Sequence, residues 1–297
     1  MKKRIALAGF TLILSATICP YVVAQQDEDV RGAFLTTRPK TTDKSAPPKR
    51  PGRRPKSRPT ASGSVTVTAT VPPGGAITAG PATTTSGPRM GMGLTLFMRD
   101  SRGMAVRTDP GREFYKGDHV RVLLETNTDG YLYIFNTTDG GKPVMIYPDA
   151  ELNDGGNYVR GHVPFEIPSS LGAEERLRWF TFDQNSGREK LYFVFTREPL
   201  PGIPMEDDLI VHCRAKSGNC PWRPADELWQ QVSRELMEPT KVAKSKKVGT
   251  SETSAEHEGA TRGIGLNRDD PEPTVIVLTA STNKAVLVAT MDLNHKG

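Results

Sequence analysis

Apolar residues fall on every second position in the central part of the chain, which is the period of a β-strand. The pattern is clearest in Val120–Thr126, where Val120, Val122 and Leu124 share one side, and in Tyr131–Asn136. Between these runs stands Asn-Thr-Asp-Gly, whose residues favour turns that let a chain reverse its direction. The sequence therefore predicts two consecutive antiparallel strands in this segment.

Further strand-like runs recur on both sides of this segment. They are spaced about 8–12 residues apart with turn residues between them, and strands do not alternate with helices. The expected strands are Leu94–Arg99, Met104–Arg107, Glu113–Asp118, Pro143–Tyr147, Tyr158–Val163, Arg178–Asp183 and Lys190–Thr196, with a C-terminal hairpin of Thr274–Ala280 and Ala285–Met291. This pattern predicts a mainly β fold, an immunoglobulin-like antiparallel β-sandwich, over residues 91–297.

One segment, Pro224–Met237, has the apolar period of a helix. Pro224 suits a first helical turn and Pro239 ends the segment. Apolar residues recur on one face at Leu228, Trp229, Val232 and Leu236. Residues 241–272, in contrast, are polar and rich in Gly, Ser and Thr. We therefore expect one short C-terminal helix, followed by a flexible excursion over 241–272.

The first 24 residues have the pattern of a secretory signal peptide. Three basic residues precede the apolar run Ile5–Ile18, which is shorter than the roughly 20 residues of a membrane span. Small residues at Val22 and Ala24 predict cleavage between Ala24 and Gln25. Lipoprotein processing at Cys19 is disfavoured because the preceding residue is bulky. We expect a secreted or periplasmic protein with no transmembrane segment in the mature chain.

Residues 25–90 are dominated by Pro, Thr, Ser, Gly, Lys and Arg, and this composition predicts a disordered arm. Within it, Arg38–Arg58 carries nine Lys or Arg residues and one Asp. The resulting charge of +8 exceeds the +5 of the whole chain, so the remainder is net negative. Such an arm favours an anionic envelope polymer as partner, or acts only as a spacer, and an exported chain is not expected to bind nucleic acid.

Two cysteines, Cys213 and Cys220, follow the expected signal peptide. Their C-x6-C spacing differs from that of redox or zinc motifs, and an even pair in an oxidising compartment favours a disulfide. The loop between them, Arg-Ala-Lys-Ser-Gly-Asn, has turn formers. We therefore expect a disulfide that closes a short loop and contributes about 2 kcal/mol.

The strand block resembles an uncharacterised bacterial family named domain of unknown function 4384 (DUF4384). The resemblance is most specific over Gly117–Phe135, continues in the Glu-Lys-Leu-Tyr sequence at Glu189–Tyr192, and includes a Leu-x-His tail at Leu293–His295. It extends over about residues 91–297 and weakens through 241–272. The resemblance implies a β-sandwich and leaves the molecular activity unassigned.

The residues that could carry chemistry do not form a known motif. The five histidines, at 119, 162, 212, 257 and 295, lack the spacing of zinc hydrolases, and no G-x-S-x-G sequence occurs. We expect each histidine on a strand surface or in a loop. We also expect no catalytic residue, cofactor or metal.

Two alternatives remain open. The loop Asp149–Asn157 has oxygen donors suited to calcium, but its glycine falls one place late for an EF-hand and Arg160 stands where glutamate is needed. A polar turn is favoured over a metal or catalytic site that combines this loop with His162. Aromatic residues could instead form a sugar-binding platform, although most should be core: Tyr131, Tyr133, Phe135, Trp179, Phe180, Phe182, Tyr192, Phe193 and Phe195.

Together these patterns predict an exported, non-enzymatic interaction module of the cell envelope, with a protein or an anionic envelope polymer as its partner.

Overall fold

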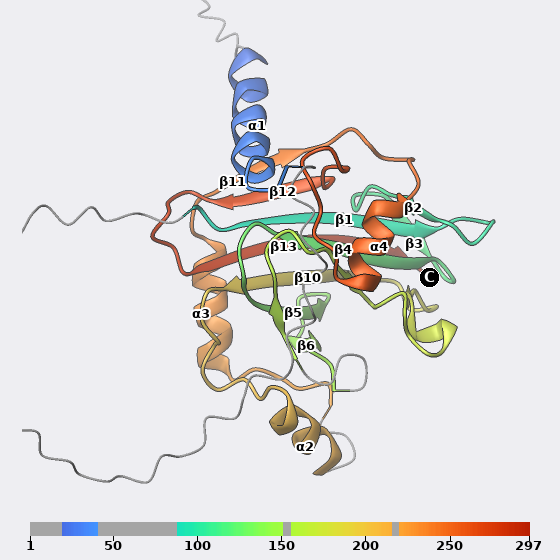
Figure 1. Cartoon of the computed structure of the whole chain (residues 1–297). Coiled ribbons are helices and arrows are strands. Elements are labelled where there is room, and N and C mark those ends of the chain that lie inside the picture. Colours follow the sequence, from blue (N-terminus) through green and yellow to red (C-terminus); the bar gives the residue numbers. More distant parts are fainter. Residues whose placement is uncertain (1–19, 41–87, 151–155, 216–219) are drawn as a thin grey trace, which may run out of the picture.

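The structure is a computed structural model that describes residues 20–40, 88–150, 156–215 and 220–297. Two β-sheets face each other (Figure 1). In the first, sheet A, the strands follow the order β11 (Thr240–Lys244), β12 (Val275–Thr279), β1 (Gly91–Arg99), β4 (His119–Thr126) and β8 (Phe165–Ile167), with β2 (Ala105–Arg107) beside β1 and β9 (Phe180–Thr181) beside β4. The mainly β, two-sheet prediction is confirmed.

Sheet B lies on the other side of the core. Its order is β3 (Glu113–Tyr115), β13 (Val286–Lys296), β10 (Gly187–Thr196), β5 (Gly130–Thr138) and β6 (Val144–Tyr147), with β7 (Tyr158–Val159) beside β5. All neighbouring strands in both sheets are antiparallel except β3 and β13, which run parallel.

Two pairs of consecutive strands were expected to form hairpins within one sheet, but in each pair the two strands belong to different sheets. β4 belongs to sheet A and β5 to sheet B, and β12 and β13 are divided in the same way. Each turn therefore carries the chain across the core. The strand pattern could not distinguish the two arrangements, because a strand that crosses to the facing sheet also buries every second side chain.

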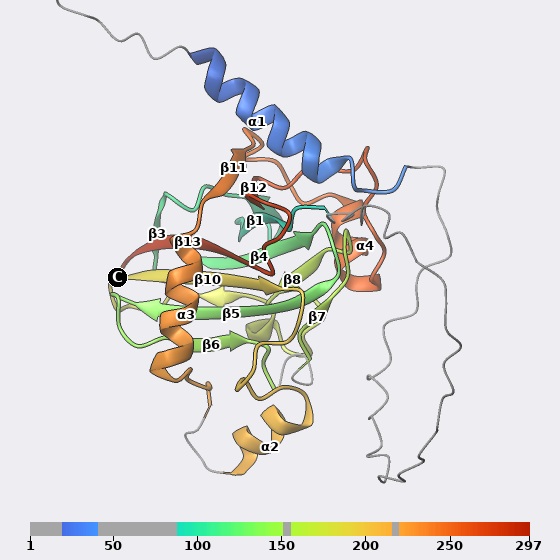
Figure 2. The same ribbon diagram turned by 90° about the vertical axis from the view of Figure 1, so that its left-hand side faces the viewer.

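The main core fills the space between the sheets. Val120, Val122 and Leu124 of β4 point into it, as their alternation predicts, and they meet Phe193 and Phe195 of β10. The opposite side of sheet B is also buried, because α3 (Asp226–Leu236) lies across it (Figure 2). Burial on both faces explains why β5, in the middle of sheet B, has one exposed position.

Helices other than α3 were not expected from the sequence. The described residues contain α1 (Pro20–Leu35), α2 (Asp207–Ala215), α3, α4 (Ser254–Arg262) and the short 3-10 helix η2 (Glu175–Leu177). The helix predicted over Pro224–Met237 corresponds to α3 and is confirmed. The prediction of one short C-terminal helix is therefore wrong in number.

The predicted flexible excursion over 241–272 is wrong. This segment contributes β11 to the edge of sheet A and forms α4. Thr253 caps α4 in a capping box, in which its hydroxyl accepts from the Glu256 N–H and the Glu256 side chain accepts from the Thr253 N–H. Thr-x-x-Glu is a sequence signature of a helix start, so this element was readable from the sequence.

The predicted disordered arm is wrong over its first part. Helix α1 packs on β11 and β12 (Figure 2), and Val30 and Phe34 are fully buried there. Two glycines of β1 leave room for the neighbouring side chains. A Cβ at Gly91 would lie 2.8 Å from the Phe34 ring, and one at Gly93 would collide with Pro273. Residues 41–87 of the arm lie outside the described residues, and the cleavage expected between Ala24 and Gln25 stays a prediction.

Cys213 and Cys220 form a disulfide, with their Cα atoms 5.3 Å apart. The bond joins the last turn of α2 to the segment before α3, and Cys213 packs against the core beneath α3. In the described part of the chain, none of the helices combines the length and the apolar character that a membrane span requires.

Candidate functional site

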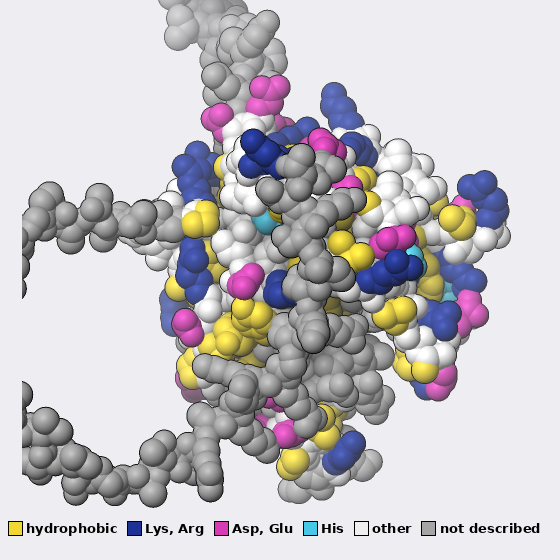
Figure 3. Space-filling view, viewed as in Figure 1, with side chains coloured by type: hydrophobic (Ala, Val, Ile, Leu, Met, Phe, Trp, Pro, Cys, Tyr) yellow, Lys and Arg dark blue, Asp and Glu magenta, His cyan; other side chains and the backbone are white. Residues whose placement is uncertain are grey.

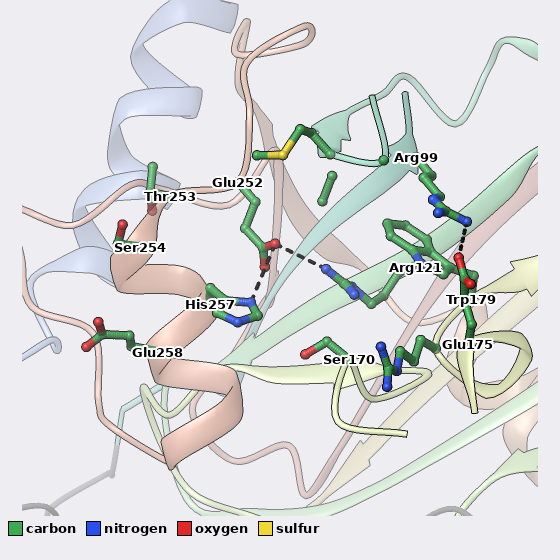
Figure 4. A pocket seen from close by; sticks show the side chains of 14 residues that line it. Arg99, Arg121, Ser170, Glu175, Trp179, Glu252, Thr253, Ser254, His257 and Glu258 are labelled. Atoms are coloured by element: carbon green, nitrogen blue, oxygen red, sulfur yellow. Dashed lines mark hydrogen bonds and ion pairs between the residues drawn. The ribbon is translucent and has the colours of Figure 1, made fainter. Parts of the chain in front are cut away.

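A pocket of about 530 Å³ opens on the outer face of sheet A. Its walls come from β1 and the turn before β2, from β4, from the segment around η2, and from the start of α4 (Figure 4). In the space-filling view, basic and acidic side chains lie close together over this part of the surface (Figure 3). The lining residues used below are Arg99, Arg121, Ser170, Trp179, Glu252 and His257.

Arg121 lies at the base of the pocket. It alternates with the core residues of β4, so its side chain projects to the outer face of the sheet. Its Nη2 atom donates to Glu252 Oε2 at 3.1 Å and lies 3.3 Å from Glu166 Oε1. The guanidinium carbon lies 4.4 Å from the centre of the Trp179 ring, a cation–π contact that holds the charge in place.

Glu252 and His257 reach the pocket because of the way α4 begins. Glu252 directly precedes the capping residue Thr253, and its N–H donates to the Ala105 carbonyl at 2.9 Å. His257 follows in the first turns of the helix, with Nδ1 3.8 Å from Glu252 Oε2 (Figure 4). The capping box therefore fixes both side chains toward sheet A.

Several buried polar atoms around Arg121 have no hydrogen-bond partner among the described residues. They are Glu166 Oε1, Glu252 Oε1, Ser170 Oγ and Arg121 Nε. An unsatisfied buried polar group costs about 1–3 kcal/mol, so native proteins rarely leave several together. The cluster indicates a site that a proton, a cation or a ligand completes.

The carboxyl of Glu252 is held in an unusual protonation state. Burial, and then the Glu166 carboxylate beside it, raise the pKa of Glu252 to about 8, against the opposing effect of Arg121. Two carboxylates that share one site cannot both ionise easily, so one proton stays with the pair near neutral pH.

Raising the pH is expected to weaken the fold through Glu252. The folded chain holds a proton up to a pKa of about 8, while the ordinary value is 4.5. The stabilising contribution is therefore complete below pH 4.5 and is lost as the pH rises through about 8. Urea denaturation in EDTA at pH 5, 7 and 9 should show Glu252→Gln gaining free energy of unfolding relative to the native chain as pH rises. Parallel pH curves for the two proteins would contradict this, and Glu258→Gln is the control.

His162 is not available for the alternative site that combined it with the loop Asp149–Asn157. Both imidazole nitrogens of His162 are occupied, Nδ1 by Glu125 at 2.7 Å and Nε2 by Thr37 at 2.8 Å. Residues 151–155 of the loop lie outside the described residues. His162 therefore lies in a turn, as expected, but is committed to a buried cluster beneath α1, and the expectation of a strand-surface or loop position is wrong for His295, which is buried in β13.

That buried cluster joins the N-terminal segment to the sandwich. Arg38 donates from Nε and Nη2 to the two carboxylate oxygens of Glu125, at 2.8 and 2.6 Å. Burial acts to raise the pKa of Glu125, but the hydrogen bonds from His162 and Arg38 outweigh it, so the pKa lies below its ordinary value. With no exposed surface, the cluster is structural.

The aromatic residues serve mainly as core. Tyr133, Phe135, Phe182, Phe193 and Phe195 are buried. Tyr131, Trp179, Phe180 and Tyr192 are partly buried and divided between both sheets. Tyr192 and Phe135 pack edge-on against Trp229 of α3.

Sequence reasoning missed the pocket. Glu166, Glu252 and His257 had no shared motif, and Glu252 and His257 fell in the segment expected to be flexible. The one available signal was the Thr253–Glu256 capping box, which places the residues beside it on an ordered helix.

No curated protein and no solved structure matches this chain. Residues 113–199 match the model of a family described as a domain of unknown function (DUF4384). The match runs from β3 just past β10 and includes Arg121 and Glu166, while Glu252 and His257 lie outside it. It supports assigning this central part of the sandwich to the DUF4384 family.

Proposed function

We propose that the protein is an exported bacterial binding module of the cell envelope, without enzymatic activity, and that its ligand occupies the pocket beside Arg121. One observation carries this proposal: Glu252 Oε1 and Ser170 Oγ lack hydrogen-bond partners and belong to residues that line a pocket formed by rigid elements, and Glu166 Oε1 lies 3.3 Å from the lining residue Arg121. Preformed pockets with a few convergent polar groups are the usual form of ligand sites.

The envelope location is supported by two features. The N-terminal pattern is that of a signal peptide, and the disulfide between Cys213 and Cys220 is compatible with an oxidising compartment. The proposed partner is a protein or an anionic polymer of the envelope, and Arg178 supplies positive charge where such a partner would approach the pocket, whereas Arg99 is paired with Glu175 at 2.6 Å.

Filling the pocket tests this function. Ser254→Trp places a bulky ring at the pocket wall, and Arg262→Trp places the same ring farther along α4, outside the lining. Purified native and variant chains are immobilised and exposed to envelope extract, separated into protein and polymer fractions. We expect Ser254→Trp to lose the retained component and Arg262→Trp to keep it. Retention by both variants would contradict a role for the pocket.

A second candidate function is acid–base catalysis by Glu252 and Glu166. It is favoured by the raised pKa of Glu252 beside Glu166, since two carboxyl groups that share one proton act as acid and base in aspartic proteases. It predicts hydrolysis of some member of a peptide panel by the native chain and not by Glu252→Gln. Equal background rates of hydrolysis for the native chain and Glu252→Gln would contradict catalysis, and binding would remain the proposed function.

A further inference from the structure

The carboxylates of Glu166 and Glu252, which both contact Arg121, have a third potential ligand beside them. One ligand atom each from Glu166, Glu252 and His257 lie within 4.8 Å of one another. Glu166 comes from β8, Glu252 from the residue before the α4 cap, and His257 from α4 itself. Elements distant in sequence therefore bring two carboxylate oxygens and one imidazole nitrogen to one point.

We infer that Glu166, Glu252 and His257 bind a divalent transition-metal cation such as Zn²⁺. This inference rests on the proposed binding function and names the ligand that the pocket takes first. Three protein ligands leave coordination positions for water or for an anionic group of an envelope component.

The donor set favours a transition metal over calcium or magnesium. Calcium and magnesium prefer all-oxygen coordination, whereas imidazole nitrogen combined with carboxylate oxygen suits Zn²⁺ and its neighbours. Zinc binds these ligands at about 2.0–2.2 Å in tetrahedral geometry, so the ligand atoms around one ion lie about 3.4 Å apart. His257 can close the remaining gap, since its side chain is 52% exposed and free to rotate.

The unpaired oxygens are the independent observation that points to a cation. The Glu166 side chain is 2% exposed, yet its Oε1 atom has only an ion-pair contact with Arg121 Nη2 at 3.3 Å and no hydrogen bond, and Oε1 of Glu252 has no hydrogen-bond donor either. A proton shared by the two carboxylates would satisfy both oxygens, one as donor and one as acceptor, but it gives no role to the imidazole 3.8 Å from Glu252 Oε2. A divalent cation would use all three groups and displace the proton that the two carboxylates share near neutral pH.

Arg121 is the group that a bound cation must displace. Its Nη2 atom lies between the two carboxylates, and its guanidinium also contacts the Trp179 ring. Cation binding therefore replaces the Arg121–Glu252 hydrogen bond, and the Trp179 ring is the contact that the guanidinium keeps.

Metal titration of the untagged, EDTA-treated native chain tests the inference. Isothermal titration with ZnCl₂ should give one saturable site, and thermal unfolding should shift upward with Zn²⁺. We expect Glu252→Gln and His257→Ala each to weaken binding by at least about 100-fold. Glu258→Gln on the same helix and His212→Ala on α2 should change the affinity by less than about threefold.

Three results would overturn the inference: no saturable Zn²⁺ binding by the native chain, undiminished binding by Glu252→Gln and His257→Ala, or equal loss in the control variants. Far-UV circular dichroism confirms that each variant is folded. Failure here is distinguishable from failure of the binding function, because the Ser254→Trp experiment is done with EDTA-treated and with Zn²⁺-loaded protein. Retention that depends on the pocket and occurs only with the EDTA-treated protein would support the binding function and contradict the cation site.

Discussion

Replacing Arg38 with Met is expected to lower the free energy of unfolding by about 3–5 kcal/mol. The substitution removes the paired hydrogen bonds to Glu125 and leaves that carboxylate buried, with a side-chain exposure of only 3%. It also removes the donors to the carbonyls of Asn267, Asp270 and Pro271. Urea denaturation monitored by tryptophan fluorescence measures the loss.

The pH dependence of this loss separates the charge from the packing. Glu125 has a lowered pKa in the folded chain, so its contribution is present above pH 4.5 and is lost as the pH falls through the folded value. The difference between native and Arg38→Met should therefore be larger at pH 7 than at pH 4.

Arg31→Met is the matched control on helix α1. Arg31 is 30% exposed and lies 3.6 Å from Glu272, so its replacement should cost less than about 1 kcal/mol. Equal costs for Arg38→Met and Arg31→Met would show that the N-terminal segment does not dock on Glu125.

Replacing Glu256 with Ala is expected to cost about 3–5 kcal/mol. Glu256 accepts two hydrogen bonds from Arg107, and each side chain of this pair is only 2% exposed. The substitution leaves a buried guanidinium without its counter-charge and also removes the capping box of α4, which contributes about 1 kcal/mol. Thermal and urea denaturation measure the loss.

Glu258→Ala provides the comparison on the same helix. Glu258 is 49% exposed and forms an i,i+4 pair with Arg262 at 3.7 Å, so its loss should cost less than about 0.5 kcal/mol. If Glu256→Ala were as mild as Glu258→Ala, the ion pair with Arg107 would not hold α4 to β2.

Strand positions were predictable because burial of alternate side chains leaves a period-2 pattern in the sequence. The prediction of Val120–Thr126 differs from β4 by one residue, and that of Lys190–Thr196 lies within β10. Assignment of strands to sheets was not predictable in the same way. Both a hairpin and a crossing between sheets satisfy the alternation, and only the long-range pairing distinguishes them.

The candidate site depends on contacts that no local pattern records. Glu166 and Glu252 are 86 positions apart in the sequence, and Arg38 and Glu125 are 87 apart. Arg38 belongs to a Pro-rich basic stretch whose composition predicts exposure to solvent. The structure instead buries Arg38 against Glu125. Composition describes the average character of a segment, whereas the burial of a single arginine depends on the carboxylate that pairs with it.

Gly91 and Gly93 make room for side chains packed on β1, including Phe34 of α1, so the folded domain begins before the first strand. A fragment cut at Met90, where the strands start, would expose the apolar surface that Val30 and Phe34 cover and would leave Glu125 without Arg38. The smallest self-sufficient unit therefore consists of two stretches of chain, residues 27–40 and the sandwich itself, and any truncation series should treat them as inseparable.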